Sequence, residues 1–506
     1  MSISAYERLK GKSRELLGLT TIGSILGWDF ETYMPPKGVT QRGEANALLQ
    51  KIGHRMLTAK DVGEILKEVE REQESLDEPQ ARDVYLFKKQ YDEATKLPEE
   101  LVAELARQQT TATAKWRDAK ANADWKKFEP ELEKTIELTK KRAELLMEVK
   151  DAKTLYDAMI DDYEPKMTQD VISNVFGELR NGLVPLVKKY SEISSGVDTS
   201  FLKVKVPIDI QRKLMQDLAE VVHYDVTSKE AGGRIDEAEH PFTTGYYDDV
   251  RVTVHYYEEN VGAALFAMLH EAGHALYEQH LNQDWKYLPL GTSSSSGIHE
   301  AMSRFVENMV GRSPEFWRYY LPKLNAITDG QFSNVSLMEF VRASNLVKPS
   351  KIRVEADEVT YSLHIILRFE IERDLMAGKI HVTDLPSVWN EKYEKYLGVE
   401  IENDTEGVLQ DIHWAFGYFG YFPSYALGNV YGGMLLEQLN KDNPEWLNEM
   451  AAGKFGLVKE WLTKSIYLTS NLYDPGDLAE RVTGKKLTSK PFLAYIEEKY
   501  SSLYET

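Results

Sequence analysis

Apolar residues recur at every third or fourth position over most of this chain, with charged residues between them. The stretch from Ala59 to Lys150 shows this spacing clearly. It places apolar side chains on one face of a helix and leaves the charged ones in water. Capping residues and helix-starting prolines recur at Asp77-Glu78-Pro79, Lys96-Leu97-Pro98, Thr168, Ser313-Pro314-Glu315 and Asn443-Pro444-Glu445. The pattern predicts a mainly α-helical protein.

One segment departs from the helical spacing. Residues 249–255 read Asp-Val-Arg-Val-Thr-Val-His, so the three valines share one face and Arg251, Thr253 and His255 share the other. A period of two residues is typical of a half-buried strand. We therefore expect a small β-strand element just before the apolar segment that begins at Val261.

The composition indicates a globular chain of 506 residues, long enough for up to about three folding units or for one large domain with a deep cleft. Acidic residues outnumber basic ones by 81 to 61, which gives a net charge of −20. This charge repels phosphate backbones and anionic lipids, so we expect neither nucleic acid nor membrane partners. The longest apolar stretch, near 261–269, is too short to span a membrane, and we expect a soluble, cytoplasmic protein.

The sequence has no cysteine, which excludes disulfides and thiolate metal ligands. Any metal ion must therefore be held by histidine and carboxylate. The only biased run, Ser293 to Ser296, is typical of a polar loop before a helix.

The main candidate for chemistry is His270-Glu271-Ala272-Gly273-His274. Histidines four residues apart lie on one helical face and can bind one ion. Glu271 projects beside them, where it can accept a proton from a metal-bound water. At this composition the pattern arises by chance only about 0.04 times per chain, so a metal site is favoured over a coincidental pair of histidines.

A catalytic zinc site needs a third protein ligand and one open position. Downstream candidates are His280, His299 and Glu300. His280 lies six residues after His274 and is turned away from the ligand face. Spacing favours Glu300, at the start of a second amphipathic helix to Val310, over His299, which stays open as the alternative.

Several ordered motifs surround these residues: His240-Pro241-Phe242, Asp249-x-Arg251-x-Thr253, His299-Glu300, Ile352-Arg353-x-x-Ala356-Asp357 and Gly407-x-x-Gln410-Asp411-x-His413-Trp414. Trp28-Asp29, Met34-Pro35 and Arg42 add a further set near the N-terminus. In these motifs, nearly the whole chain resembles the M32 family of HExxH metallocarboxypeptidases, the thermostable carboxypeptidase Taq type.

The resemblance implies a helical, two-lobed peptidase with a deep central groove that removes single residues from the C-termini of peptides, usually as a homodimer. It implies Glu300 as the third ligand and one divalent metal per chain, with Zn²⁺ favoured and Co²⁺ as the alternative. We expect one M32-type domain over 1–506, with an N-terminal helical region at about 1–200 and a metal-bearing catalytic region at about 201–506. Where the family pattern reads His-Glu-Ser/Thr-Gln, this chain has Ala301-Met302 after His299-Glu300, which removes a polar group near the metal or the substrate.

In the expected reaction, a metal-bound water attacks the peptide carbonyl, and Glu271 takes its proton and passes it to the leaving amine. The oxyanion needs a further donor. The glycine-rich segment 417–433 offers Tyr418, Tyr421, Tyr425 and Tyr431, as in similar helical peptidases. We favour Tyr421, with His413 in support.

A carboxypeptidase must recognise a free carboxylate, which arginine binds bidentately. Arg353 and Arg251 lie in the family motifs, and Arg353 is the first choice. His240 and His299 are assigned to the substrate groove on the same resemblance. The alternatives are a helical zinc endo-oligopeptidase, which needs no carboxylate-binding arginine, and a silent peptide-binding scaffold, against which the intact Glu271 argues.

Overall fold

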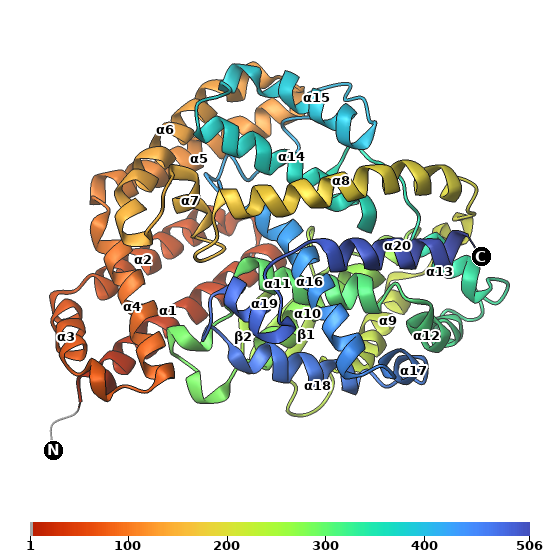
Figure 1. Ribbon diagram of the computed structural model, residues 1–506, viewed down its shortest axis with the longest axis horizontal. Helices are drawn as coiled ribbons and strands as arrows, with labels where there is room; N and C mark the ends of the chain where they lie inside the picture. The colour runs from red at the N-terminus through yellow and green to blue at the C-terminus, as the bar shows by residue number, and fades with distance from the viewer. Residues whose placement is uncertain (1–3, 506) are drawn as a thin grey trace.

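The structure, a computed structural model, describes residues 4–505 and confirms the predicted helical fold with a small sheet (Figure 1). The first part contains α1 (Ala5–Thr32), α2 (Val39–Leu57), α3 (Lys60–Arg71), α4 (Glu78–Lys96), α5 (Glu99–Asn122), α6 (Trp125–Lys150), α7 (Leu155–Ile160), α8 (Gln169–Ser194) and α9 (Ile208–Val221). None of the helices within 4–505 is both long and apolar enough to cross a membrane.

The later part of the chain contains the remaining helices, among them the one that carries His270, Glu271 and His274. They are α10 (Val261–Gln279), α11 (Ser296–Arg304), the π-helix η6 (Phe305–Val310), α12 (Pro314–Ile327), α13 (Leu337–Ser344), α14 (Glu358–Met376), α15 (Leu385–Leu397), α16 (Phe422–Asp442), α17 (Trp446–Ala451), α18 (Gly456–Ser465), α19 (Pro475–Thr483) and α20 (Lys490–Tyr504). Figure 1 shows α10, α11 and α16 near the middle, with α1–α4 at one side.

Polar caps begin several helices where the sequence predicted a start. Asp77 and Gln80 form a reciprocal capping box at α4. The Thr168 hydroxyl accepts a hydrogen bond from the Val171 amide at α8, and Ser313 accepts one from the Phe316 amide at α12. These side chains satisfy amides that have no partner within the helix, so they fix where each helix begins.

The sheet has the order β1-β3-β2 and consists of β1 (Gly233–Glu237), β2 (Phe242–Tyr246) and β3 (Asp249–Val254). Strand β3 runs parallel to β1 and antiparallel to β2. Its three valines are fully buried, as predicted. Thr253 was expected on the half-exposed face but is also buried, because its hydroxyl accepts a hydrogen bond from the Phe242 amide at 3.0 Å and β2 covers it.

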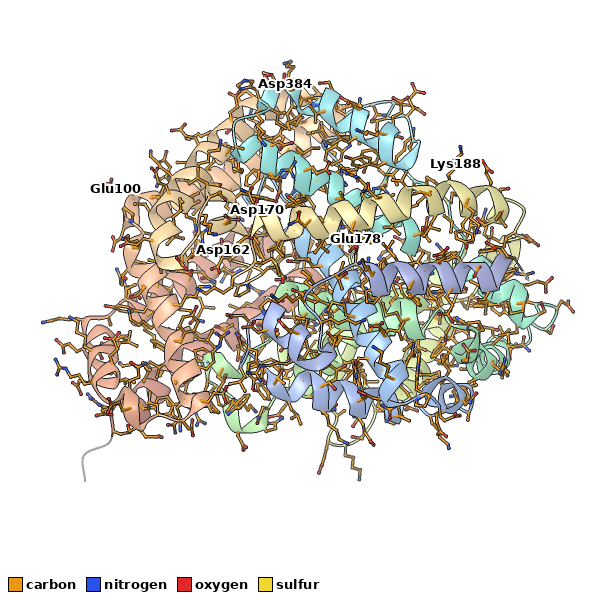
Figure 2. The ribbon with its side chains drawn as sticks, in the orientation of Figure 1. Glu100, Asp162, Asp170, Glu178, Lys188 and Asp384 are labelled. Atoms are coloured by element: carbon orange, nitrogen blue, oxygen red, sulfur yellow. The ribbon has the colours of Figure 1, made fainter. Side chains whose placement is uncertain are left out.

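Two hydrophobic cores lie within the described residues. The larger runs from Ala112 to Leu503 and crosses position 200 without a break. The smaller holds α1, α3 and α4 together, and α2 contributes no buried residue to either core. Charged side chains cover the outside, as at Glu100 and Lys188 in Figure 2.

Candidate metal centre and substrate pocket

Helix α10 places two imidazoles on one face. Asn260 caps the start of α10, and most of the helix's apolar side chains, among them Leu265 and Leu269, are completely buried. The rings of His270 and His274 lie one turn apart, with centroids separated by 5.0 Å. Because α10 is packed into the core, these two side chains have a rigid support.

Helix α11 brings Glu300 to the same place. The sequence predicted a helix starting at Glu300, but α11 starts at Ser296, because the Ser295 hydroxyl caps the Ile298 amide. Glu300 therefore lies one turn inside the helix and is 5% exposed.

Glycines allow the three helices of the site to approach closely. A Cβ on Gly273 of α10 would lie 2.4 Å from the Met302 carbonyl oxygen of α11, and one on Gly428 of α16 would lie 2.7 Å from Glu300 Cγ. Either side chain would force the helices apart. The position of Glu300 therefore depends on having glycine at both 273 and 428.

The three expected ligands converge. Their donor atoms all lie within 4.8 Å of one another, and Glu300 Oε2 is 3.7 Å from His270 Nε2 and 3.5 Å from His274 Nε2. Donors at about 2.0–2.1 Å from one tetrahedral ion lie roughly 3.3–3.5 Å apart. The residues present therefore fit a two-histidine, one-carboxylate metal site.

Outer partners fix the orientation of both imidazoles. His270 Nδ1 donates to Glu307 Oε2 at 2.9 Å, and His274 Nδ1 lies 2.5 Å from His299 Nδ1. His299 Nε2 in turn donates to Glu278 Oε1 at 2.7 Å. Both ligand histidines are left with Nε2 for a metal, and His299 lies behind His274 rather than beside it in the ligand set.

The protonation of His274 and Glu300 suits a cation site. Burial, together with the neighbouring His299, lowers the pKa of His274 to about 3, so its ring is neutral. Burial acts to raise the pKa of Glu300, but Arg304 and His270 outweigh it and hold that pKa well below its usual range. A neutral imidazole and an ionised carboxylate are the forms that bind metal.

Glu271 faces the pocket next to the ligands. Its Oε2 accepts a hydrogen bond from the Thr243 hydroxyl of β2 at 2.6 Å, and burial raises its pKa. Sequence reasoning missed Thr243, although it directly follows the His240-Pro241-Phe242 motif. The contact holds the carboxylate in one orientation beside the site.

The pocket above these residues has a volume of about 420 Å³. Its walls come from β2, α10, the serine run, α11 and the start of α16. They comprise Pro241, Phe242, Thr243, His270, Glu271, His274, Ser293, Ser296, His299, Glu300, Tyr421, Ser424 and Tyr425.

Two tyrosines line the pocket from the α16 side. Tyr421 stacks on the His413 ring, with centroids 5.5 Å apart, whereas His413 Nε2 lies 3.4 Å from the Tyr425 hydroxyl. Tyr418 is largely exposed, and Tyr431 is fully buried and not among the lining residues. The structure thus brings Tyr421 and Tyr425 to the site.

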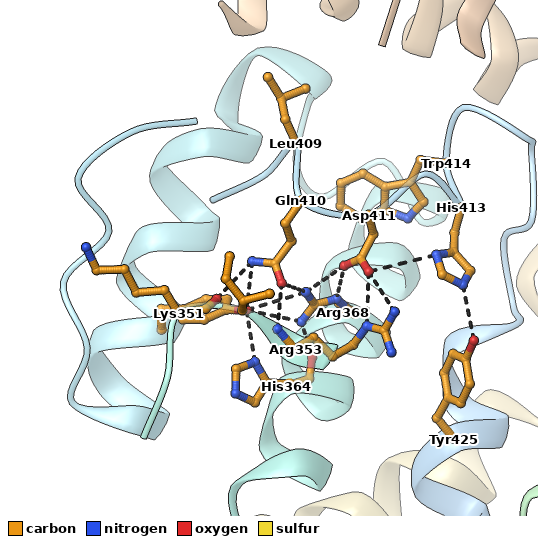
Figure 3. Close-up of polar contacts among 12 residues, drawn as sticks. Lys351, Arg353, His364, Arg368, Leu409, Gln410, Asp411, His413, Trp414 and Tyr425 are labelled. Carbon is orange, nitrogen blue, oxygen red and sulfur yellow. Dashed lines mark hydrogen bonds and ion pairs between the residues drawn. The ribbon is translucent and has the colours of Figure 1, made fainter. Parts of the chain in front are cut away.

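A second group of charges lies beside Tyr425, and Figure 3 shows it in close-up. Asp411 accepts hydrogen bonds from Arg353 Nε at 3.0 Å and from Arg368 Nε at 2.8 Å. We call these three residues the arginine cluster. Both arginines are buried, and together they hold the pKa of Asp411 far below its usual range although burial acts to raise it. Sequence reasoning missed Arg368, although a single charge within the apolar run 365–369 indicates a buried ion pair.

Three of the residues expected to bind substrate, Arg353, Arg251 and His240, do not line the pocket. Arg353 is not among the pocket-lining residues, and its guanidinium lies 5.0 Å from the centre of the Tyr425 ring. Arg251 pairs with Asp249 and lies over the Trp28 ring. His240 is exposed and also outside the lining.

Below the pocket, a buried carboxylate joins α11 to α16. Glu164 Oε1 accepts hydrogen bonds from the Gly297 amide and from the Ser424 hydroxyl, while Oε2 has no hydrogen-bond partner among the described residues. Burial raises the pKa of Glu164 from 4.5 to about 7. Sequence reasoning missed this residue, because no local pattern links position 164 to helices more than 130 residues away.

Known proteins share this sequence and fold. The family model described as carboxypeptidase Taq (M32) metallopeptidase matches residues 8–500. The chain is 38% identical to thermostable carboxypeptidase 1 of Thermus thermophilus over 99% of both chains, and 38% identical to carboxypeptidase 1 of Bacillus subtilis over 95% of both. The crystal structure of the M32 carboxypeptidase from Deinococcus radiodurans R1 matches with a TM-score of 0.95 and 34% identity, covering 99% of this chain and 100% of that one.

Proposed function

This chain belongs to the M32 family of metallocarboxypeptidases, and from that premise we propose that His270, His274 and Glu300 hold its catalytic metal ion. The observation that carries the proposal is the convergence of two Nε2 atoms and one carboxylate oxygen at the floor of a pocket. Zn²⁺ is the favoured ion and Co²⁺ the alternative, because a two-histidine, one-carboxylate site accepts both. When bound, the ion supplies Lewis acidity toward the scissile carbonyl and the attacking water.

Glu271 acts as the general base. Its carboxylate lies in the pocket beside the ligands without belonging to them, so it takes the proton of the attacking water and delivers it to the leaving amine. The Thr243 hydroxyl keeps it aimed. Tyr421 donates to the developing oxyanion, and His413 supports it by packing against its ring.

Recognition of the substrate's free carboxylate comes from the arginine cluster. Two arginines share one aspartate there, so the cluster carries surplus positive charge next to a pocket wall. Arg353 is the member nearer the pocket. Its guanidinium lies behind the Tyr425 ring, and from there its positive charge attracts the substrate carboxylate. His299 orients His274 and also lines the pocket, while the assignment of Arg251 and His240, which lie outside the lining, stays a prediction.

Matched peptides with free and amidated C-termini test the exopeptidase function. We expect cleavage of the free acid alone, abolished by a chelator and restored by Zn²⁺ or Co²⁺, with metal content measured on the same preparation. Equal cleavage of both peptides would favour the endo-oligopeptidase. Hydrolysis of neither peptide after metal is restored would favour the scaffold.

We also propose that the protein is a homodimer that pairs through α1 and α2. Gly23 packs against Leu49 and Gly53 against Leu19, so the two helices lie together. The outer side of this pair exposes the apolar side chains of Ile22, Ile25, Leu48 and Ile52. A 19-residue helix without one buried residue is typical of a surface that a second copy covers.

Light scattering tests the dimer. We expect the parent to have the mass of two chains and an Ile25→Asp, Leu48→Asp variant the mass of one. Val171→Asp, which changes an equally exposed apolar residue on α8, is the matched control and keeps the dimer. A monomeric parent, or a dimeric double variant, contradicts the proposal.

A further inference from the structure

We propose that Arg304 is a positioning residue that occupies one oxygen of Glu300 and so restricts this carboxylate to a single metal contact. The inference rests on the proposed metal site. It concerns how many coordination positions the protein uses, and therefore how many stay open for water and substrate.

The two oxygens of Glu300 have different surroundings. Arg304 Nε donates to Oε1 at 2.8 Å, whereas Oε2 is the oxygen that faces both ligand imidazoles. The Ser303 hydroxyl lies 3.1 Å from Oε2, but its single proton has a closer acceptor in the Glu300 carbonyl oxygen at 2.7 Å. Oε2 is thus the oxygen left for the ion.

Arg304 is itself held on three sides. Its Nη1 donates to Glu307 Oε2 at 3.3 Å, and its guanidinium lies 3.9 Å from the centre of the Tyr361 ring. The same Glu307 oxygen orients His270. The planar guanidinium of Arg304 therefore connects Glu300, the third ligand, to Glu307, which orients His270.

The helix supplies this arrangement through its spacing. Glu300, Arg304 and Glu307 follow one another at i, i+4 and i+7, which places them on one helical face. Arg304 is the last residue of α11, directly before the π-helix η6. Wide π-turns inside helices are frequent at functional sites.

The charge of Arg304 argues for a geometric role. A buried guanidinium next to a metal site repels the bound cation, so by charge alone it weakens metal binding. A carboxylate freed to use both oxygens would bind more tightly but would consume a position that a catalytic site keeps open. The two effects of losing Arg304 therefore have opposite signs: stronger binding and slower turnover.

The experiment compares Arg304→Gln and Arg304→Lys with Arg312→Lys. Arg312 donates to Glu307 Oε1 at 3.1 Å but makes no contact with Glu300, so it controls for disturbance of Glu307. Arg304→Lys keeps the positive charge but loses the planar arrangement of donors that reaches both Glu300 and Glu307. Each protein is loaded with Co²⁺, and its visible absorption, its Co²⁺ affinity against a competing chelator, its kcat and KM, and its melting temperature are measured.

We expect Arg304→Gln to bind Co²⁺ at least as tightly as the parent, with weaker visible absorption, because cobalt bands lose intensity as the coordination number rises. Its kcat falls by about 10- to 100-fold with KM nearly unchanged. Arg304→Lys shows the same spectral change in smaller measure, and Arg312→Lys keeps the parent spectrum. If Arg304→Gln does not fold, the spectrum of Arg304→Lys decides.

An unchanged spectrum in both Arg304 variants overturns the proposal, as does loss of metal affinity alongside a lower melting temperature, which marks a purely structural residue. A parent that binds no Co²⁺ at this site, or that hydrolyses no peptide, overturns the proposed function instead. The two failures are therefore distinguishable.

Discussion

Two buried groups of charges lie near each other in this protein, and they are built from the same residue types in opposite proportion. Around the metal centre, the carboxylates outnumber the arginines; the groups are Glu271, Glu300, Glu307, Arg304 and Arg312. In the arginine cluster, two arginines share one aspartate. The excess of negative charge at the metal centre suits a divalent cation, and the excess of positive charge in the arginine cluster suits a substrate carboxylate.

The two groups also differ in what they leave unbonded. At the metal centre the ligand atoms face one another and the pocket, whereas both oxygens of Asp411 accept from arginine. Tyr361 separates the groups, with Arg304 over its ring and Arg353 donating to its hydroxyl at 3.3 Å. Burial of charge alone does not identify a reactive site. A reactive site is identified instead by ligand atoms that converge on one shared pocket.

The strongest test of this contrast is Glu271→Gln, which removes the base while leaving the three ligands in place. We expect kcat to fall by about 10³-fold with metal content unchanged. Metal analysis and steady-state kinetics on one preparation check this. Near-parent hydrolysis would remove Glu271 from the mechanism.

The next largest effect separates the two pocket tyrosines. Tyr421→Phe should lower kcat by about 10²-fold with little change in KM, because the lost hydroxyl serves only the oxyanion. Tyr425→Phe is the matched control, since it loses its contact with His413, and should lower kcat by less than about tenfold. The reverse order would transfer the role to Tyr425.

Arg353→Gln tests the surplus positive charge. We expect KM for free-acid peptides to rise by at least about tenfold with metal content unchanged, because the substrate carboxylate loses a nearby positive charge; tenfold corresponds to about 1.4 kcal/mol. Arg368→Gln removes the other arginine of the same aspartate, farther from the pocket, and should lower the melting temperature without a comparable rise in KM. Metal loss in Arg353→Gln would assign that residue a structural role.

The last expected effect is on stability rather than on catalysis, and it concerns Glu164, a buried carboxylate with no arginine partner within residues 4–505. Its pKa is raised from 4.5 to about 7, so between these values the unfolded chain gives up a proton that the folded chain keeps. Folded stability therefore falls as pH rises through this window, by at most about 3 kcal/mol. Glu164→Gln cannot titrate, so its melting temperature relative to the parent should be higher at pH 8 than at pH 5. An unchanged difference would contradict the raised pKa.

Local pattern predicted the parts of the molecule that depend on neighbours in sequence. The helical spacing, the valine alternation of β3 and the His270-Glu271-His274 face are of this kind. Strands β1 and β2 were not predicted, because Gly-Arg-Ile-Asp-Glu and Phe-Thr-Thr-Gly-Tyr show no clear alternation and pair only through β3. Thr243, Glu164 and Arg368 were missed for the same reason. Their partners come from distant segments, and only tertiary packing brings them together.

The absent side chains at Gly273 and Gly428 have a consequence for how the enzyme acquires its ion. Where α10, α11 and α16 meet backbone to backbone, Glu300 is placed by folding rather than by the arrival of the cation. We therefore expect loading to require no ordering of the polypeptide around Glu300, so that its rate depends on access through the pocket mouth and on the loss of hydration water from the incoming ion.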